Sequence, residues 1–164
     1  MIEKGSIMSS GFAVLLVLGI GFVAGLRTMT APVVVAWAAH LGWIHLSGTP
    51  LAFMGSVWAV GFFTLGALAE YVFDQLPSTP PRTGARGLIS RTVTSLLSGA
   101  CLAIAGGSSP WLAVIAVVGA MAAAFGGYYA RTGLVRALRV PDIVIAIPED
   151  LIAVGLGLLI VTRY

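Results

Sequence analysis

Four acidic residues inside otherwise apolar sequence are the side chains of this protein best suited to chemistry. Glu70 and Asp74 stand four residues apart, so a continuous helix would place both on one face. Glu149 and Asp150 are neighbours that follow Pro148 within another long apolar stretch. A carboxylate inside a membrane span is costly to leave unpaired, so its presence there points to function.

Two arginines can supply the positive charge that these carboxylates need. Arg27 interrupts the first apolar stretch, and Arg91 lies near the start of a later one. Charged side chains within membrane spans are normally paired with one another. We therefore predict one polar cluster for ion or substrate binding, made of Arg27, Glu70, Asp74, Arg91, Glu149 and Asp150.

Three kinds of chemistry fit this cluster. The acids could pair with Arg27, Arg91 or Arg131 and do no more than lock the helices together. A carboxylate could instead bind and release a proton or a cation along a transport pathway. The acids could also hold Mg²⁺ for work on a phosphorylated lipid, with Arg82, Arg86 or Arg91 binding the phosphate.

The composition of the chain assigns the helices that carry these residues to a membrane. Of its 164 residues, 59% are hydrophobic and 9% are charged, with a mean hydropathy of +1.02, whereas soluble domains carry about 25% charged residues. The net charge of +3 comes without a basic stripe interleaved with aromatic residues, so we expect no nucleic-acid partner. We expect a single helical domain over residues 1–164, in contact with membrane lipids.

Apolar stretches long enough to cross a bilayer, roughly 17–25 residues, mark the helices of this domain. Four are evident, at residues 51–72, 87–105, 111–130 and 143–162. A polar, proline-rich connection separates the first from the second, and a Gly-Gly-Ser-Ser-Pro turn separates the second from the third.

The stretch 11–44 can be interpreted in two ways, because Arg27 and Pro32 interrupt it. As a single helix it would hold Arg27 near the bilayer midplane, which costs about 2.5–3.5 kcal/mol. As two short helices it places Arg27 at the membrane edge, with Pro32 in the first turn of the second helix and Thr28 or Thr30 as its cap. We therefore predict an all-α membrane bundle of six short segments, or five if this hairpin is one continuous span.

The basic residues predict the orientation of the bundle. In the six-segment arrangement seven of the nine Lys and Arg residues fall at one face, which leaves only Lys4 and Arg163 at the other. Lys and Arg in short loops stay cytoplasmic, so we predict a multi-pass protein of a bacterial inner membrane with its Arg-rich loops in the cytoplasm. The seven residues are Arg27, Arg82, Arg86, Arg91, Arg131, Arg136 and Arg139.

Small residues recur at four-residue spacing, which lets helix backbones approach closely in lipid. The positions are Gly21 with Gly25, Ser95 with Gly99, and Gly119 with Ala123 and Gly127. They predict tight packing inside the bundle, and the same faces could also join copies of the chain in a homo-oligomer.

Few residues in the chain are suited to enzymatic or metal chemistry. His40 and His45 are too few ligands for a metal site and fit an interfacial position beside tryptophans. Cys101 stands alone in an apolar run, where it has no partner for an internal disulfide. The sequence has no phosphate-binding loop, dinucleotide fingerprint or serine nucleophile elbow. We therefore expect no metal and no cofactor, and we favour a role other than catalysis.

Three short motifs carry a family resemblance. Ala-Gly-Leu-Arg at 24–27 is followed by Pro32, Glu-x-x-x-Asp-Gln-Leu-Pro occupies 70–77, and Glu-Asp-Leu occupies 149–151. Over residues 11–161 this pattern resembles a bacterial family of multi-pass membrane proteins known as domain of unknown function 4126. The resemblance implies a multi-pass membrane protein in which the arginine and the acidic positions are recurring polar features.

A second similarity offers a chemistry. Asp-Gln-Leu-Pro-Ser-Thr-Pro at 74–80 and Ile-Pro-Glu-Asp-Leu-Ile-Ala at 147–153 are similar to acidic motifs of phosphatidylglycerophosphatase A, a small membrane enzyme that uses Mg²⁺. This similarity implies a Mg²⁺-dependent lipid-phosphate enzyme as one alternative, and a structural or assembly protein is the other. Our leading expectation is a small transporter or channel-like protein with the acidic and arginine cluster on its cytoplasmic side.

Overall fold

Six α-helices and two short 3₁₀ helices form the part of the chain that the computed structural model describes, residues 10–74 and 84–164. The α-helices are α1 (Ser10–Leu26), α2 (Thr30–His40), α3 (Val57–Phe73), α4 (Ala85–Ala105), α5 (Ala113–Leu138) and α6 (Asp142–Val161). The 3₁₀ helices are η1 (Ala52–Gly55) and η2 (Pro110–Leu112). The prediction of an all-α bundle with six segments is confirmed.

Three of the helical segments are long and apolar enough to cross a membrane. They are Ala85–Ala105, Pro110–Leu138 and Asp142–Val161, the second of which joins η2 to α5. The helices α1, α2 and α3 are apolar but shorter, at 17, 11 and 17 residues. At 1.5 Å per residue, α2 covers about 16 Å, roughly half of a 30 Å hydrocarbon core. The three long segments mark the chain as a membrane protein.

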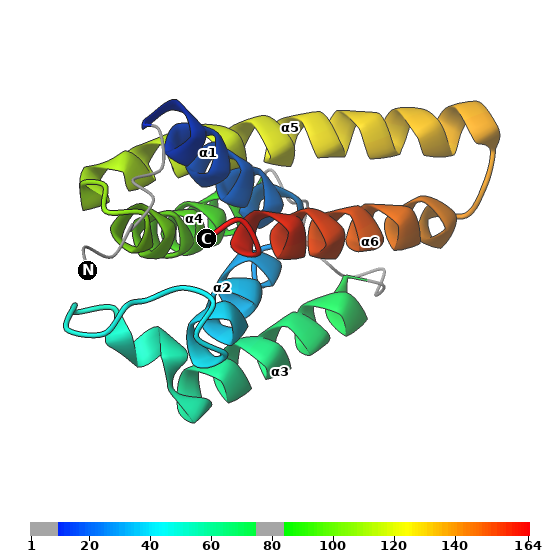
Figure 1. Cartoon of the computed structure of the whole chain (residues 1–164). Helices are drawn as coiled ribbons and strands as arrows, with labels where there is room; N and C mark the ends of the chain where they lie inside the picture. Colours follow the sequence, from blue (N-terminus) through cyan, green and yellow to red (C-terminus); the bar gives the residue numbers. More distant parts are fainter. Residues whose placement is uncertain (1–9, 75–83) are drawn as a thin grey trace.

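Successive helices run back and forth between two ends of the bundle (Figure 1). The last turns of α1, α3 and α5 lie with the first turns of α2, α4 and α6, at what we call the polar end. The opposite end holds the connections 41–56 and 106–112. At the polar end α5 and α6 project beyond the other helices (Figure 1).

The polar end carries the described arginines that the sequence places on one face, namely Arg27, Arg86, Arg91, Arg131, Arg136 and Arg139. Arg82 lies outside the described residues. Arg163 follows α6 and lies at the opposite end, as predicted. The predicted segregation of charge along the bundle is therefore present in the fold.

The stretch 11–44 folds as two helices, with Arg27 in the break between α1 and α2. Pro32 lies in the first turn of α2, where its missing N–H costs no hydrogen bond. The predicted cap is wrong, because neither Thr28 nor Thr30 caps α2 through its side chain. The carboxylate of Glu70 on α3 accepts hydrogen bonds there instead. The two helices also diverge from the break, and they touch little beyond it (Figure 1).

Two other predicted boundaries are wrong. Helix α3 begins at Val57 and not at residue 51, because the hydroxyl of Ser56 accepts a hydrogen bond from the Ala59 N–H (3.1 Å) and caps the helix there. Helix α5 does not end at residue 130 but continues through the basic segment to Leu138. It stops where Arg139 adopts a left-handed backbone conformation, with φ of 53°.

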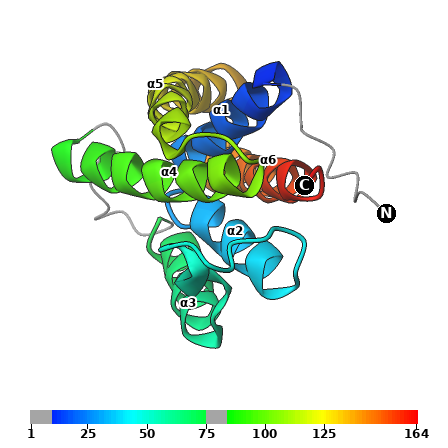
Figure 2. The same ribbon diagram turned by 60° about the vertical axis from the view of Figure 1, so that its left-hand side comes forward.

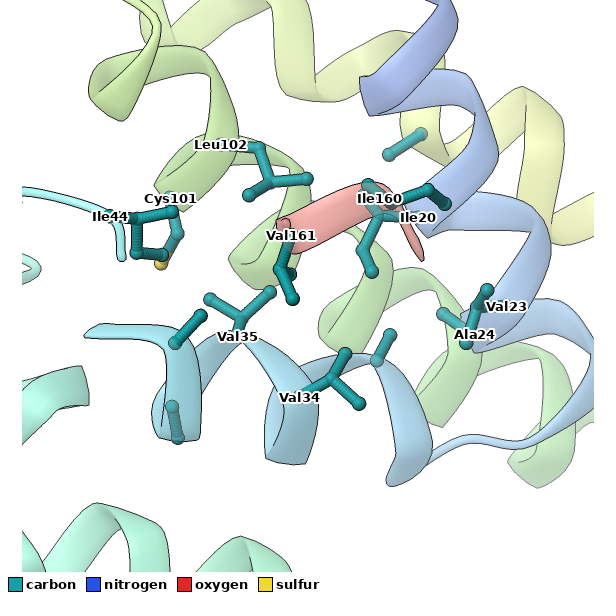
Figure 3. Close-up of a cluster of buried hydrophobic side chains, with 14 of the residues drawn as sticks. Ile20, Val23, Ala24, Val34, Val35, Ile44, Cys101, Leu102, Ile160 and Val161 are labelled. Atoms are coloured by element: carbon teal, nitrogen blue, oxygen red, sulfur yellow. The ribbon is translucent and has the colours of Figure 1, made fainter. Parts of the chain in front are cut away.

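The core is built around α1, which packs against α4, α5 and α6, whereas α3 packs chiefly on α2 at the edge of the bundle (Figure 2). Its centre is apolar and draws side chains from four helices and one connection (Figure 3). The helices contribute Ile20, Val23 and Ala24 of α1, Val34 and Val35 of α2, Cys101 and Leu102 of α4, and Ile160 and Val161 of α6. The connection 41–56 contributes Ile44. Burial among these apolar groups accounts for the lone cysteine as a packing residue.

Glycines bring α1 and α5 into direct backbone contact. A Cβ added to Gly21 or Gly25 would overlap a backbone carbonyl oxygen of α5, and one added to Gly119 would overlap the backbone of α1. Gly99 of α4 is similarly close to α5, where its added Cβ would lie 2.8 Å from the Cβ of Ala116. The predicted use of these small residues in packing within the bundle is confirmed. A homo-oligomer would therefore have to use other faces.

We expect Gly119→Ala to lower the free energy of unfolding, because its added methyl group would lie 2.9 Å from the Phe22 nitrogen and overlap the Leu18 carbonyl oxygen. Overpacking of this kind costs about 1–3 kcal/mol. Gly133→Ala on the same helix is the matched control, since its added Cβ meets nothing within 4 Å; that change should stabilise the helix by about 0.5–1 kcal/mol. Thermal unfolding of the purified protein in detergent distinguishes the two, and equal midpoints would contradict the close α1–α5 contact.

Candidate functional site

Arg27 lies at the centre of the polar end, and its side chain is completely buried. Its guanidinium donates through Nη1 to the carboxylate of Asp74, the residue that caps the C-terminus of α3. Through Nε it donates to the carboxylate of Asp150 on α6. We call these three residues the Arg27 network; it ties the break after α1 to α3 and to α6.

The Arg27 guanidinium also meets an aromatic ring. Its Cζ lies 5.4 Å from the centre of the Tyr71 ring, within the range of a cation–π interaction. Its Nη2 is buried and has no hydrogen-bond partner among the residues that the structure describes. A buried donor without a partner is energetically costly.

Glu70 of α3 caps the N-terminus of α2 with its carboxylate. Its Oε1 accepts a hydrogen bond from the Thr28 N–H and its Oε2 accepts one from the Met29 N–H, both at 2.7 Å. A carboxylate at a helix N-terminus also meets the positive end of the helix dipole. One turn further along α3, Asp74 reaches Arg27, so both acids face the break between α1 and α2 as their four-residue spacing predicts.

Arg91 joins α4 to α1 and is buried, with 4% of its surface exposed. Its Nε donates to the Gly25 carbonyl oxygen at 2.9 Å, and its Nη1 donates to the Gly87 carbonyl oxygen at 3.1 Å. The carbonyl groups in the last turn of a helix lack partners within that helix, and Arg91 satisfies one of those of α1. Arg91 is a predicted member of the polar cluster, and its contact with Gly25 brings it to the neighbourhood of Arg27.

A second network forms between α5 and α6. Arg131 donates through Nε to Asp142 at 2.7 Å and through Nη2 to the other oxygen of the same carboxylate. Its Nη1 donates to Oε2 of Glu149 at 3.3 Å. We call Arg131, Asp142 and Glu149 the Arg131 network. Asp142 is absent from the predicted cluster because it lies at the start of α6, where nothing in the sequence distinguishes it from a solvated helix-capping acid.

Helix α6 connects the two networks through adjacent residues. Successive residues of a helix point about 100° apart, so Glu149 faces Arg131 on α5 while Asp150 faces Arg27. Pro148 precedes them inside the helix and has no N–H to donate to the carbonyl oxygen of Val144. The helix is therefore easiest to bend at the point where the networks meet.

A groove of about 430 Å³ opens between α1, α5 and α6 beside the Arg131 network. Its wall is mostly apolar, and two charged side chains, Arg131 and Glu149, line it. The groove exists because α5 and α6 touch each other much less than either touches α1. Gly126 and Gly127 of α5 present no side chain to it.

The end of the bundle opposite the polar end holds a second hollow and two histidines. A hollow of about 340 Å³ lies beside the connection 41–56 and includes His45. The Nδ1 atom of His40 is 2.9 Å from the Gly55 carbonyl oxygen, so this histidine links α2 to η1. Burial raises the pKa of Tyr164, beyond α6, to about 12.

Within residues 10–74 and 84–164, no three His, Cys, Asp or Glu side chains are grouped so that they could hold a metal ion.

Comparisons with protein-family models, with curated proteins and with solved structures find no match to this chain. Its function therefore has to be inferred from the polar end and the groove. The resemblance to domain of unknown function 4126 remains a prediction from the sequence motifs.

We expect Arg27→Met to destabilise the protein strongly, because Asp74 and Asp150 would then lose their shared counter-ion. Removal of one partner of a buried ion pair costs about 3–5 kcal/mol. Adding Asp74→Asn and Asp150→Asn to the same protein should recover much of this loss. Arg136→Met, at an exposed position on α5, should change stability by less than about 0.5 kcal/mol.

Thermal unfolding in detergent is the measurement for all of these variants. An Arg27→Met protein that unfolds at the temperature of Arg136→Met would show that the Arg27 network contributes nothing to the fold.

Proposed function

We propose that this protein is a small transporter or channel-like protein in which the charged cluster at the polar end binds and releases a proton or a cation. The observation that carries the proposal is the junction at Glu149 and Asp150. Through it, a buried network centred on Arg27 is joined to a network that lines a groove. A cluster built only to lock helices together would have no need of the groove.

The poor hydration of the cluster's carboxylates supports exchange of a proton or a cation. Each network places one guanidinium between two carboxylates. Asp142 is 60% exposed and solvated, but the side chains of Asp74, Glu149 and Asp150 are between 10% and 21% exposed. Carboxylates held at poorly hydrated positions in a membrane bundle are candidates to take up and release a proton or a cation.

Helix α6 offers a means of coupling. Because Glu149 and Asp150 lie on one helix next to Pro148, a bend there would move both carboxylates at once. Binding of a proton or a cation at the groove would then change the ion pairs of Arg27. A change in the ion pairs of Arg27 would likewise change binding at the groove. Coupling of this kind is what a transporter requires between a substrate site and an ion site.

A structural or assembly role is the second candidate. It is favoured by the observation that Glu70, Asp74, Glu149 and Asp150 all accept hydrogen bonds from groups of other helices or helix ends. A Mg²⁺-dependent lipid-phosphate enzyme gains no such support, since the described residues hold no group of carboxylates arranged around a common point.

We also propose that the polar end faces the cytoplasm of a bacterial cell and that the protein lies in the inner membrane. The support is the distribution of basic residues, because the connections 41–56 and 106–112 at the other end contain neither Lys nor Arg. The resemblance to domain of unknown function 4126 agrees with this location.

Orientation can be tested with single reporter cysteines in a Cys101→Ser background. We expect Gly48→Cys to react with an impermeant maleimide added to intact cells, and Val140→Cys, between α5 and α6, to react only after the membrane is opened. The basis is the retention of basic loops in the cytoplasm. The reverse pattern would overturn the proposed orientation.

Function can be tested by measuring ion flux in liposomes that contain the purified protein and a pH-sensitive dye. A potassium diffusion potential should drive a proton or Na⁺ flux above that of empty liposomes. Glu149→Gln, which keeps the shape of the side chain but removes its charge, should lower the flux by about ten-fold or more, as expected for loss of an essential charged group. The exposed variant Arg136→Gln is the control and should retain the flux.

The structural candidate predicts a different result. The unaltered protein would then pass no more ions than empty liposomes under either sign of potential, and Glu149→Gln would change only the unfolding temperature. That outcome would contradict the transport proposal.

A further inference from the structure

We propose that the groove between α1, α5 and α6 binds one chain of a membrane glycerolipid, and that an ester carbonyl of this lipid accepts a hydrogen bond from Arg131. Such binding is independent of ion transport by the cluster. It is indicated by the direction of the groove, by the change of polarity along it and by the hydrogen-bond donors of Arg131.

The groove runs along helices that cross the membrane. On α5 its wall extends from Ala122 to Leu134, about 18 Å at 1.5 Å per residue. Ala122, Gly126 and Ala130 belong to this wall and are exposed on the surface of the bundle. Both α5 and α6 are long and apolar enough to span a bilayer, so an exposed groove between them faces lipid.

Polarity changes along the groove as it does within one leaflet of a bilayer. Helices α1 and α5 end at the polar end, and α6 begins there (Figure 1). The wall residues farthest from that end are Phe22, Ala122 and Ile152, all of which are apolar. Arg131 lies about 14 Å nearer to the polar end than Ala122. A lipid chain directed toward the bilayer centre would therefore meet apolar groups, with the polar part of the lipid near Arg131.

Arg131 lies at about the depth of lipid esters. Arg136 and Arg139 are exposed farther along α5, and basic side chains near the ends of membrane helices extend to the headgroups. Arg131 precedes Arg136 by about 8 Å of helix, and the headgroup region of one leaflet is about 5–8 Å thick. Arg131 is therefore near the boundary of the hydrocarbon core, where fatty-acid esters are found.

Arg131 retains hydrogen-bond donors for such an ester. A guanidinium carries five N–H groups, one on Nε and two on each terminal nitrogen. Within the described part of the chain, Arg131 donates from Nε and Nη2 to Asp142 and from Nη1 to Glu149. One N–H therefore remains on each of Nη1 and Nη2. The side chain lines the groove and is 12% exposed, so an uncharged carbonyl can accept without displacing either carboxylate.

Two other occupants match the groove less well. The phosphate of a lipid lies farther from the bilayer centre than its esters do, at the level of the exposed arginines and not of Arg131. A helix of a second copy is about 10 Å across, so an 18 Å length of it fills roughly 1,400 Å³. The groove holds about 430 Å³, which is in the range of small-molecule sites.

The test compares two lipids that differ only in the acceptor group. Diester and diether phosphatidylcholines of equal chain length are titrated onto the purified, unaltered protein in detergent, and binding of the first lipid is followed by native mass spectrometry. We expect the diether lipid to bind about ten-fold or more weakly, because it lacks the carbonyl that accepts from the charged donor. Diester phosphatidylglycerol should bind within about three-fold of diester phosphatidylcholine, since the headgroup is not recognised.

Two leucine substitutions on α5 locate the lipid chain. Gly126→Leu should weaken binding of the diester lipid by about ten-fold or more, because Gly126 lines the groove and its added Cβ meets nothing within 4 Å. Gly133→Leu is the matched control; it has equally open surroundings but lies outside the groove, so binding should change by less than about two-fold.

Two arginine substitutions test the hydrogen bond. Arg131→Met should reduce the difference between diester and diether lipids to less than about two-fold, because the donor is lost. Arg136→Met, exposed farther along the same helix, should keep the ten-fold difference. If Arg131→Met does not fold, the two lipids on the unaltered protein and the two leucine substitutions still decide.

Four results would overturn the proposed lipid site. They are equal affinities of the diester and diether lipids, phosphatidylglycerol binding that is tighter by about ten-fold or more, equal effects of the two leucine substitutions, and an unchanged ester preference in a folded Arg131→Met protein. Tighter phosphatidylglycerol binding would indicate recognition of a charged headgroup. Because lipid binding is measured at equilibrium in detergent, its failure is distinguishable from a failure of ion flux in liposomes.

Discussion

The burial of Arg27 is the constraint on which the rest of this structure depends. A guanidinium held in an apolar bundle requires carboxylates, and here they come from α3 and α6, far apart in the sequence. The same break that exposes Arg27 to these acids leaves backbone N–H groups at the start of α2, which Glu70 satisfies. Four helices are thereby fixed around one short interruption of the chain.

Helix α6 carries that constraint to the other side of the bundle. Its adjacent acids belong to different networks, so neither α5 nor the break after α1 can be displaced without an effect on the other. Pro148 lies next to both and weakens the helix at that point. Tight contacts through glycine hold α1 and α5 close together. The fold thus combines a firm framework with one helix that is suited to bend.

The groove gains its significance from this arrangement. An apolar hollow in a membrane bundle would ordinarily be filled by a lipid chain. Here its wall also includes Arg131 and Glu149, which connect the groove to the charged networks of the polar end.

The sequence by itself determined that the chain is a helical membrane protein and that Glu70 and Asp74 share a face, and it favoured a break at Arg27 over one continuous helix. These features follow from hydropathy and from helical periodicity, which are local properties. Only the tertiary structure decided which acid meets which arginine, that Glu70 caps α2, that Asp142 joins the Arg131 network, and that a groove lies beside Glu149. Such pairings depend on distances between segments remote in sequence, and those distances are set by how closely the glycine faces of α1 and α5 allow the helices to pack.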